Sequence, residues 1–268
     1  MDLELTGKRA VVTGGNRGIG LAVARALAAE GCDVALVARD KAALEAARDS
    51  IAAAAGRTVF AVPCDTGDDE SVAAMAAAVT KGLGGADILV NAAARANTGA
   101  VVGIEDFDTA EFGEQVNVKV LGYLRCARAL VPHMRAAGWG RIINVSGLAA
   151  RSSGSVTGTV RNVAVAALTK NLADELGKDG INVTVVHPGV TVTEKTQAVL
   201  VERAGRAGVT TAEIERRLGA AVSIGRLVTA EEVAAGIAYL ASPLAASVTG
   251  TALAVDGGMA GLRLRPRS

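Results

Sequence analysis

The stretch RAVVTGGNRGIG, residues 9–20, decides the fold of this chain. RAVVT has the composition of a buried strand, and residue 20 opens an alanine-rich helical stretch, GLAVARALAAEG. Glycines in the turn between them can adopt positive φ, and backbone amides at a helix N-terminus attract an anion. A strand, a glycine-rich turn and a helix in this order predict a site for the phosphates of a dinucleotide.

Apolar runs rich in Val, Ile and Leu recur along the chain and alternate with alanine-rich helical stretches. The predicted strands cover residues 8–14, 33–39, 58–65, 86–92, 141–147, 181–189 and 252–258. Nearly continuous apolar strands are typical of a parallel sheet buried on both faces. The alternation predicts an α/β fold with a single-domain, Rossmann-type, doubly wound parallel sheet flanked by helices. No linker or repeat divides residues 1–268, in which we expect a substrate-loop region at 190–220 and a C-terminal tail at 259–268. Within the loop region, residues 196–218 have the pattern of an amphipathic helix.

Composition excludes several functional classes. The chain has 28 basic and 27 acidic side chains, a net charge of +1, which argues against a nucleic-acid partner. No apolar run approaches the ~18 residues of a membrane span, so no membrane partner is expected. The three cysteines, Cys32, Cys64 and Cys126, show no CxxC spacing, which disfavours a disulfide framework or a metal site and fits a reducing compartment. With no signal-peptide pattern at the N-terminus, a cytoplasmic location is expected.

The end of the second predicted strand favours NADP(H) over NAD(H). An acidic residue at this position would bind the ribose diol of NAD, and Ala38 cannot do so. Arg39, together with Arg17 in the glycine turn, can instead pair with the additional phosphate of NADP.

Six short motifs follow one another along the chain. They are Thr13-Gly14 with Gly18-Ile19-Gly20, Cys64-Asp65, Asn91-Ala92-Ala93-Ala94, Asn117 in QVNVKVLG, Pro188-Gly189-Val190-Thr191-Val192-Thr193, and VTGTALAVDGG at 248–258. In this order they resemble the short-chain dehydrogenase/reductase family over nearly the whole chain. Joined to the arginines above, the resemblance implies a nucleotide site made of Thr13, Gly14, Asn16, Arg17, Gly18, Ile19, Gly20, Arg39, Asp65, Asn91, Pro188, Gly189, Thr191 and Thr193.

The catalytic residues that the resemblance implies are missing from their expected positions. Members of the family use a tyrosine to move a proton to or from the substrate oxygen, a lysine four residues later, a serine and an asparagine. Counting back from the matching helix VAVAALTK at 163–170 places Gly158 at the tyrosine position and Asn162 at the lysine position. Gly147 stands where the serine belongs. A shift by one residue would offer Thr157, whose aliphatic hydroxyl is a poor proton donor.

The tyrosine count leads to the same conclusion without an alignment. The chain has two tyrosines, Tyr123 and Tyr239, and neither is followed by lysine four residues later. The phenol needs such a neighbour because its ordinary pKa is about 10. Of the four catalytic residues that the resemblance implies, only Asn117 is present.

Polar residues near the expected strand ends are the candidates for any remaining chemistry. His187 can act as an acid or base because histidine titrates near neutral pH, although such a histidine more often packs against the sheet. Ser146 and Arg161 are the other catalytic candidates, and Arg95 with Arg161 could clamp a carboxylate or phosphate. The Ser-, Thr- and Gly-rich run 152–159 predicts a loop.

These observations leave three alternative functions open. The first is a non-catalytic structural or regulatory subunit of an oligomer with an active relative. The second is an enzyme with atypical chemistry, which reduces an activated carbonyl or imine or catalyses an elimination or cyclisation of a small-molecule substrate. The third is an ordinary NADPH-dependent ketone reductase, against which the tyrosine count weighs. The resemblance also implies a homo- or hetero-oligomer, a dimer or tetramer, that assembles through helices around 104–135 and 151–177.

Overall fold

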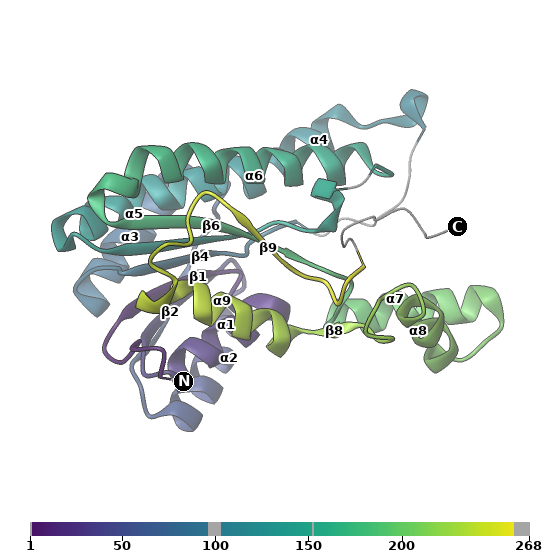
Figure 1. Ribbon diagram of the computed structural model, residues 1–268, viewed down its shortest axis with the longest axis horizontal. Coiled ribbons are helices and arrows are strands. Elements are labelled where there is room, and N and C mark those ends of the chain that lie inside the picture. Colours follow the sequence, from purple (N-terminus) through teal and green to yellow (C-terminus); the bar gives the residue numbers. More distant parts are fainter. Residues whose placement is uncertain (1, 96–102, 152, 260–268) are drawn as a thin grey trace.

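The computed structural model describes residues 2–95, 103–151 and 153–259, and it has three layers, a parallel sheet between two sets of helices (Figure 1). The main sheet has seven strands in the order β3-β2-β1-β4-β5-β6-β9. The strands are β1 Arg9–Thr13, β2 Asp33–Ala38, β3 Val59–Pro63, β4 Ile88–Asn91, β5 Gly140–Val145, β6 Ile181–Pro188 and β9 Ala252–Val255, with β7 Thr191–Val192 and β8 Val228–Thr229 paired separately. All neighbouring strands are parallel. The predicted Rossmann-type sheet is confirmed.

Helices cover both faces of this sheet. They are α1 Gly18–Ala29, α2 Lys41–Ala55, α3 Asp69–Leu83, α4 Thr109–Val116, α5 Gly122–Ala137, α6 Val156–Leu176, α7 Glu194–Ala207, α8 Thr211–Gly219 and α9 Ala230–Ala241. Short turns are η1 Ile104–Asp106, the π-helical η2 Asn117–Leu121, η3 Leu148–Arg151, η4 Gly177–Asp179 and η5 Pro243–Ala245. Figure 1 shows α4, α5 and α6 on one face and α1, α2 and α9 on the other, with α7 and α8 beyond one end of the strands.

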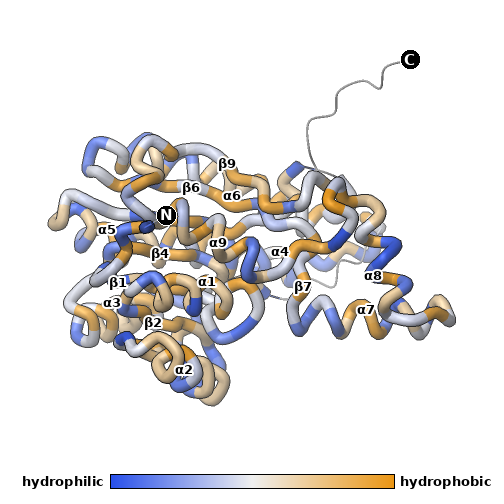
Figure 2. The backbone as a smooth tube through the Cα atoms, turned by 60° about the horizontal axis from the view of Figure 1, so that its bottom comes forward, coloured by the Kyte–Doolittle hydropathy of each residue, from blue (hydrophilic) through white to orange (hydrophobic). Residues whose placement is uncertain are grey.

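Two apolar cores, one on each face, hold the layers together. One joins α1, α2 and α9 to the sheet, and the other joins α3, α5 and part of α6 to it. Aliphatic side chains such as Val12, Leu36 and Ile143 are completely buried, as near-continuous apolar strands require. Figure 2 shows the hydrophobic residues along inner strands such as β4 and β6.

Strand β1 lies between β2 and β4, so the strand order reverses direction along the sheet at this point. In open parallel sheets such a reversal leaves a crevice beyond the carboxyl ends of the strands, where ligands bind. The register aligns Thr13 of β1 with Val37 and Asn91 of its neighbours, so these three strands end together. The glycine turn therefore opens directly onto the crevice.

Two local predictions were wrong. Residues 156–159, expected to be a loop, form the first turn of α6, because the side chain of Ser155 accepts a hydrogen bond from the amide of Gly158 and caps the helix. The expected single amphipathic helix over 196–218 is broken into α7 and α8 by Gly208, which has a φ of 63°. The predicted tail, apart from Met259, lies outside the described residues. None of the helices in the described part of the chain combines the length and apolar character that a bilayer span requires.

Candidate functional site

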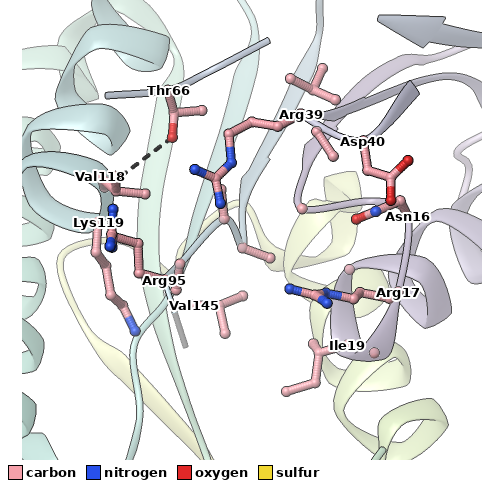
Figure 3. Close-up of a pocket in the computed structure, with 18 of the residues that line it drawn as sticks. Asn16, Arg17, Ile19, Arg39, Asp40, Thr66, Arg95, Val118, Lys119 and Val145 are labelled. Carbon is pink, nitrogen blue, oxygen red and sulfur yellow. Dashed lines mark hydrogen bonds between the residues drawn. The ribbon is translucent and has the colours of Figure 1, made fainter. Parts of the chain in front are cut away.

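A cavity of about 830 Å³ lies at the carboxyl ends of β1, β2, β4 and β5 (Figure 3). The predicted site residues that line it are Gly14, Asn16, Arg17, Gly18, Ile19, Gly20, Arg39, Asp65, Ser146, Arg161 and Thr193. Its lining does not include Thr13, Asn91, Asn117, His187, Pro188, Gly189 or Thr191, which are all described residues. The fold thus brings the glycine turn and two of the four catalytic candidates to one cavity.

Three of the predicted residues outside the lining lie in the strands and loops next to the cavity, and two of them link these segments by hydrogen bonds. The hydroxyl of Thr13 accepts a hydrogen bond from the amide of Ala92 at 3.1 Å, which ties the end of β1 to the end of β4. Asn91 is fully buried in β4. The Asn117 side chain donates to the carbonyl oxygen of Gly67 at 3.1 Å and so joins η2 to the loop after β3.

The glycine turn has the geometry that a phosphate requires. Gly14 and Gly18 have φ of 70° and 54°, a region that favours glycine. A Cβ on Gly20 would lie 2.1 Å from the carbonyl oxygen of Gly14, so no larger residue fits there. Arg17, the N-cap residue of α1, makes no side-chain cap bond to the helix, which leaves its first amides directed at the cavity. These residues fit the pyrophosphate of a dinucleotide.

A carboxylate accepts a hydrogen bond from one of the amides at the N-terminus of α1. The Oε2 atom of Glu194, the first residue of α7, accepts a hydrogen bond from the Gly18 amide at 3.2 Å. A carboxylate at a helix N-terminus is stabilised by the same partial charges that attract a phosphate. Glu194 therefore occupies the position in which the pyrophosphate is expected.

The adenosine end of the cavity carries two arginines and is open to solvent. Arg39 follows β2, its side chain is 62% exposed, and its guanidinium lies 4.0 Å from a carboxylate oxygen of Asp65. Arg17 is also exposed, and its side chain extends toward the cavity from the same side as that of Arg39 (Figure 3). Two guanidinium groups, with Ala38 rather than an acidic residue as the last residue of β2, suit the additional phosphate of NADP.

A buried lysine, which the sequence analysis did not single out, lies at the other end of the cavity. Lys119 in η2 is only 4% exposed, lines the cavity, and donates from Nζ to the carbonyl oxygen of Ser146 at 3.0 Å (Figure 3). Burial, with the positive charge of Arg161, lowers the pKa of Lys119 from 10.5 to about 7. Its ammonium group can therefore lose a proton near neutral pH.

The two arginines predicted to form an anion clamp have different surroundings. Arg95 pairs with Glu111 at 3.2 Å and Glu114 at 3.7 Å, so its charge is balanced. Arg161 is 8% exposed, and its Nη1 donates to the side-chain oxygen of Gln115. None of the described residues hydrogen-bonds to its buried Nε atom. Burial lowers the pKa of Arg161 as well.

His187 lies behind the cavity wall. It is 3% exposed, and within the described part of the chain its Nδ1 atom has no hydrogen-bond partner. Burial lowers the pKa of His187, and the charges of Arg151 and Lys119 lower it further, while a hydrogen bond with the Gly147 backbone opposes them. The neutral imidazole is thus the favoured form. Among the described residues, no three His, Cys, Asp or Glu side chains group as metal ligands.

Comparison with known proteins agrees with this geometry. A family model described as enoyl-(acyl carrier protein) reductase matches residues 14–260. The chain belongs to the short-chain dehydrogenase/reductase family. The short-chain reductase protein NovJ of Streptomyces niveus is 35% identical over 252 residues, 93% of this chain and 92% of that protein. The L-sorbose reductase of Gluconobacter frateurii, solved with NADPH and L-sorbose, superposes with a TM-score of 0.92 at 33% identity, covering 98% of this chain and 100% of its own. A structure of actinorhodin polyketide ketoreductase with NADPH gives a TM-score of 0.88 at 32% identity, covering 95% and 98%.

The residues assigned to the serine, tyrosine and lysine positions of the short-chain dehydrogenase/reductase family lie together in this structure. The hydroxyl of Ser146 donates to the backbone oxygen of Asn162 at 3.1 Å, and the Asn162 side chain donates to the Gly158 carbonyl oxygen at 2.8 Å. A Cβ on Gly147 would lie 3.5 Å from the Asn162 amide nitrogen, in ordinary contact. A serine would therefore fit at Gly147 without displacing its neighbours.

Neither tyrosine of the chain lines the cavity, and both lie in described segments. Tyr123 of α5 is 1% exposed, and its hydroxyl donates to the carbonyl oxygen of Val145 at 3.0 Å. Burial raises the pKa of Tyr123 far above its usual value. Tyr239 is in α9, which packs on α1 on the opposite face of the sheet from α5 (Figure 1).

Proposed function

We propose that this protein binds NADP(H), in preference to NAD(H), and lacks the tyrosine-dependent ketone reduction of its relatives. The absence of any tyrosine from the cavity lining within the described segments carries this proposal. Two relatives described above were solved with NADPH, which supports the choice of nucleotide.

The residues of this chain have separate tasks in the proposal. The α1 amides and Arg17 would hold the pyrophosphate, and Arg39 would pair with the additional phosphate of NADP. When bound, the nicotinamide supplies or takes up a hydride. The cavity offers Ser146, Lys119 and Arg161 as the polar groups of the catalytic end. The proton of any hydride-transfer reaction would have to come from this group or from the substrate itself.

Of the two roles that lack a catalytic tyrosine, an enzyme with atypical chemistry is favoured by one observation. Two buried cations line the catalytic end, and burying them is unfavourable unless an anion offsets their charge. A subunit whose role is only structural has no need of such an arrangement.

An assembly with further chains of this fold is favoured by a different observation. The outer face of α6 exposes Val156, Val160 and Val163, which recur at helical spacing, and Leu121 and Leu124 are exposed near the start of α5. Such a face is typical of an interface. We infer an oligomer formed through α5 and α6, with identical or related chains. An oligomer is compatible with both roles.

Fluorescence titration with NADPH and NADH tests the nucleotide proposal. We expect saturable binding of NADPH and weaker binding of NADH. Arg39→Ala should reduce NADPH affinity about tenfold, as loss of a charge-assisted hydrogen bond predicts, and leave NADH affinity nearly unchanged. Arg25→Ala is the matched control, because Arg25 is an exposed arginine of α1 that does not line the cavity. Equal affinity for both nucleotides, or no binding of either, would contradict the proposal.

A further inference from the structure

Lys119 and Arg161 come from different elements and meet at the catalytic end of the cavity. Lys119 is in η2 and Arg161 is in the second turn of α6. Both side chains are more than nine-tenths buried, and both line the cavity beside Ser146. In contrast, Arg17 and Arg39 at the nucleotide end are exposed. The cavity thus has a buried pair of basic residues at one end and two exposed arginines at the other.

The buried pair has no acidic partner at ion-pairing distance within residues 2–95, 103–151 and 153–259. Every aspartate and glutamate of the chain falls in these ranges. Glu111 is the carboxylate closest to Arg161 in the hydrogen-bond network, where the Gln115 side chain links the two by donating to Glu111 at 2.7 Å. The charge of Glu111 favours the protonated form of Arg161, but no carboxylate in the described ranges forms an ion pair with Arg161 or Lys119.

Hydrogen-bond donors of the pair remain unused. Nζ of Lys119 has three protons when charged, and it donates to the carbonyl oxygen of Ser146. Nε of Arg161 is buried and has no hydrogen-bond partner among the described residues. An ammonium and a guanidinium are together a common receptor for an oxyanion, because both donate charge-assisted hydrogen bonds to its oxygens.

The two charges also oppose each other. The field of Arg161 is one cause of the lowered pKa of Lys119, and it acts on Lys195 of α7 as well. An oxyanion between Lys119 and Arg161 would reverse this repulsion and restore the ordinary preference of Lys119 for the protonated state.

We propose that Lys119 and Arg161 form a binding site for an anionic group, a carboxylate or a phosphate, carried by the molecule that occupies the catalytic end of the cavity. This inference deepens the proposed function and rests on it for the placement of the nucleotide at the other end. The substrate class is therefore a small molecule with one oxyanion close to its reacting centre.

Calorimetric titration of the NADP⁺-saturated protein with acetate, malonate and inorganic phosphate tests this site, with sodium chloride at equal ionic strength as the salt control. The wild-type protein should bind one equivalent of a probe, and the preferred probe distinguishes a carboxylate from a phosphate ligand. Lys119→Met and Arg161→Gln should each weaken that binding about 10- to 100-fold, the range for loss of a charge-assisted hydrogen bond. Lys170→Met is the matched control, because Lys170 is exposed on α6 and pairs with Asp174.

A second measurement does not depend on variants that fold. Reductive methylation of the wild-type protein, followed by peptide mass spectrometry, should modify Lys119 in the free protein, and the bound probe should protect it, while Lys170 is modified equally in both samples.

Three results would overturn the anion site. These are no probe binding by the wild-type protein at millimolar concentrations, binding unaffected in both pocket variants, or a loss of NADP⁺ affinity in Lys119→Met as large as the loss of probe affinity. The last would assign the pair to the nucleotide's own phosphates. If NADP⁺ does not bind but the probe still binds through both residues, the nucleotide proposal fails and the anion site stands.

Discussion

Replacing Lys119 with methionine should stabilise the protein at neutral pH. The fall in the pKa of Lys119 from 10.5 to about 7 corresponds to roughly 5 kcal/mol of unfavourable free energy when the folded protein keeps this side chain charged. Methionine has nearly the same length and no charge. The Ser146 carbonyl loses its partner in the variant, which costs about 1–3 kcal/mol. The net stabilisation at pH 6 should therefore be about 2–4 kcal/mol.

The sign of the pH dependence follows from the lowered pKa. Between about pH 7 and pH 10.5 the folded wild-type protein binds fewer protons at Lys119 than the unfolded chain does, so its stability rises with pH over this window. The variant lacks this contribution. Its advantage over the wild type should thus be largest below pH 7 and should shrink by about 3 kcal/mol between pH 6 and pH 9.

Urea unfolding of both proteins at pH 6, 7.5 and 9, without nucleotide or added oxyanion, measures this difference. Arg161 is present in both proteins and stays charged throughout this pH range, so its own titration does not enter the comparison. Lys170→Met provides the exposed control and should show no such pH dependence. A variant less stable than the wild type at pH 6, or a difference that does not change with pH, would refute the assignment of a strained buried ammonium.

Three other variants test the remaining parts of the site. The triple variant Gly147→Ser, Gly158→Tyr, Asn162→Lys should create or raise NADPH-dependent reduction of simple ketones by about 10²–10⁴-fold, the usual contribution of general acid–base catalysis, and a rate unchanged from the parent would count against the assigned positions. Glu194→Gln removes a carboxylate from the pyrophosphate position and should strengthen NADPH binding about 2- to 5-fold by fluorescence titration, whereas weaker binding would mean that Glu194 assists the nucleotide. Tyr123→Phe removes one buried hydrogen bond and should lower the free energy of unfolding by about 1 kcal/mol without changing any turnover, and a loss of turnover would show that Tyr123 takes part in the chemistry.

Local sequence patterns were sufficient to predict most of the fold. Six of the seven predicted strands of the main sheet lie within two residues of their observed bounds, because a strand buried on both faces has a continuous apolar run that ends where polar or glycine residues begin. The seventh, predicted for 252–258, ends three residues earlier, at Val255. The start of α6 was missed because Gly158 and Thr157 disfavour helix locally, and only the cap by Ser155 and packing against the sheet fix the first turn.

The nucleotide end of the site could also be located from the sequence, since its function depends on contiguous residues of one turn. Lys119 could not, because its burial depends on the contact between η2 and the end of β5, 27 residues later in the chain. A lysine two residues after Asn117 looks like an ordinary surface position of a helix. The difference between Arg95 and Arg161 likewise depends on tertiary neighbours, the carboxylates of α4, that spacing alone does not reveal.

The steady-state rate of NADPH oxidation by the unaltered protein, with saturating simple ketones and with NADPH occupancy verified by fluorescence, tests the central claim most directly. The account predicts an occupied nucleotide site with turnover about 10²–10⁴-fold below that of a tyrosine-containing relative assayed in parallel. Turnover equal to that relative would contradict it, because the cavity would then hold a proton donor as effective as the missing phenol.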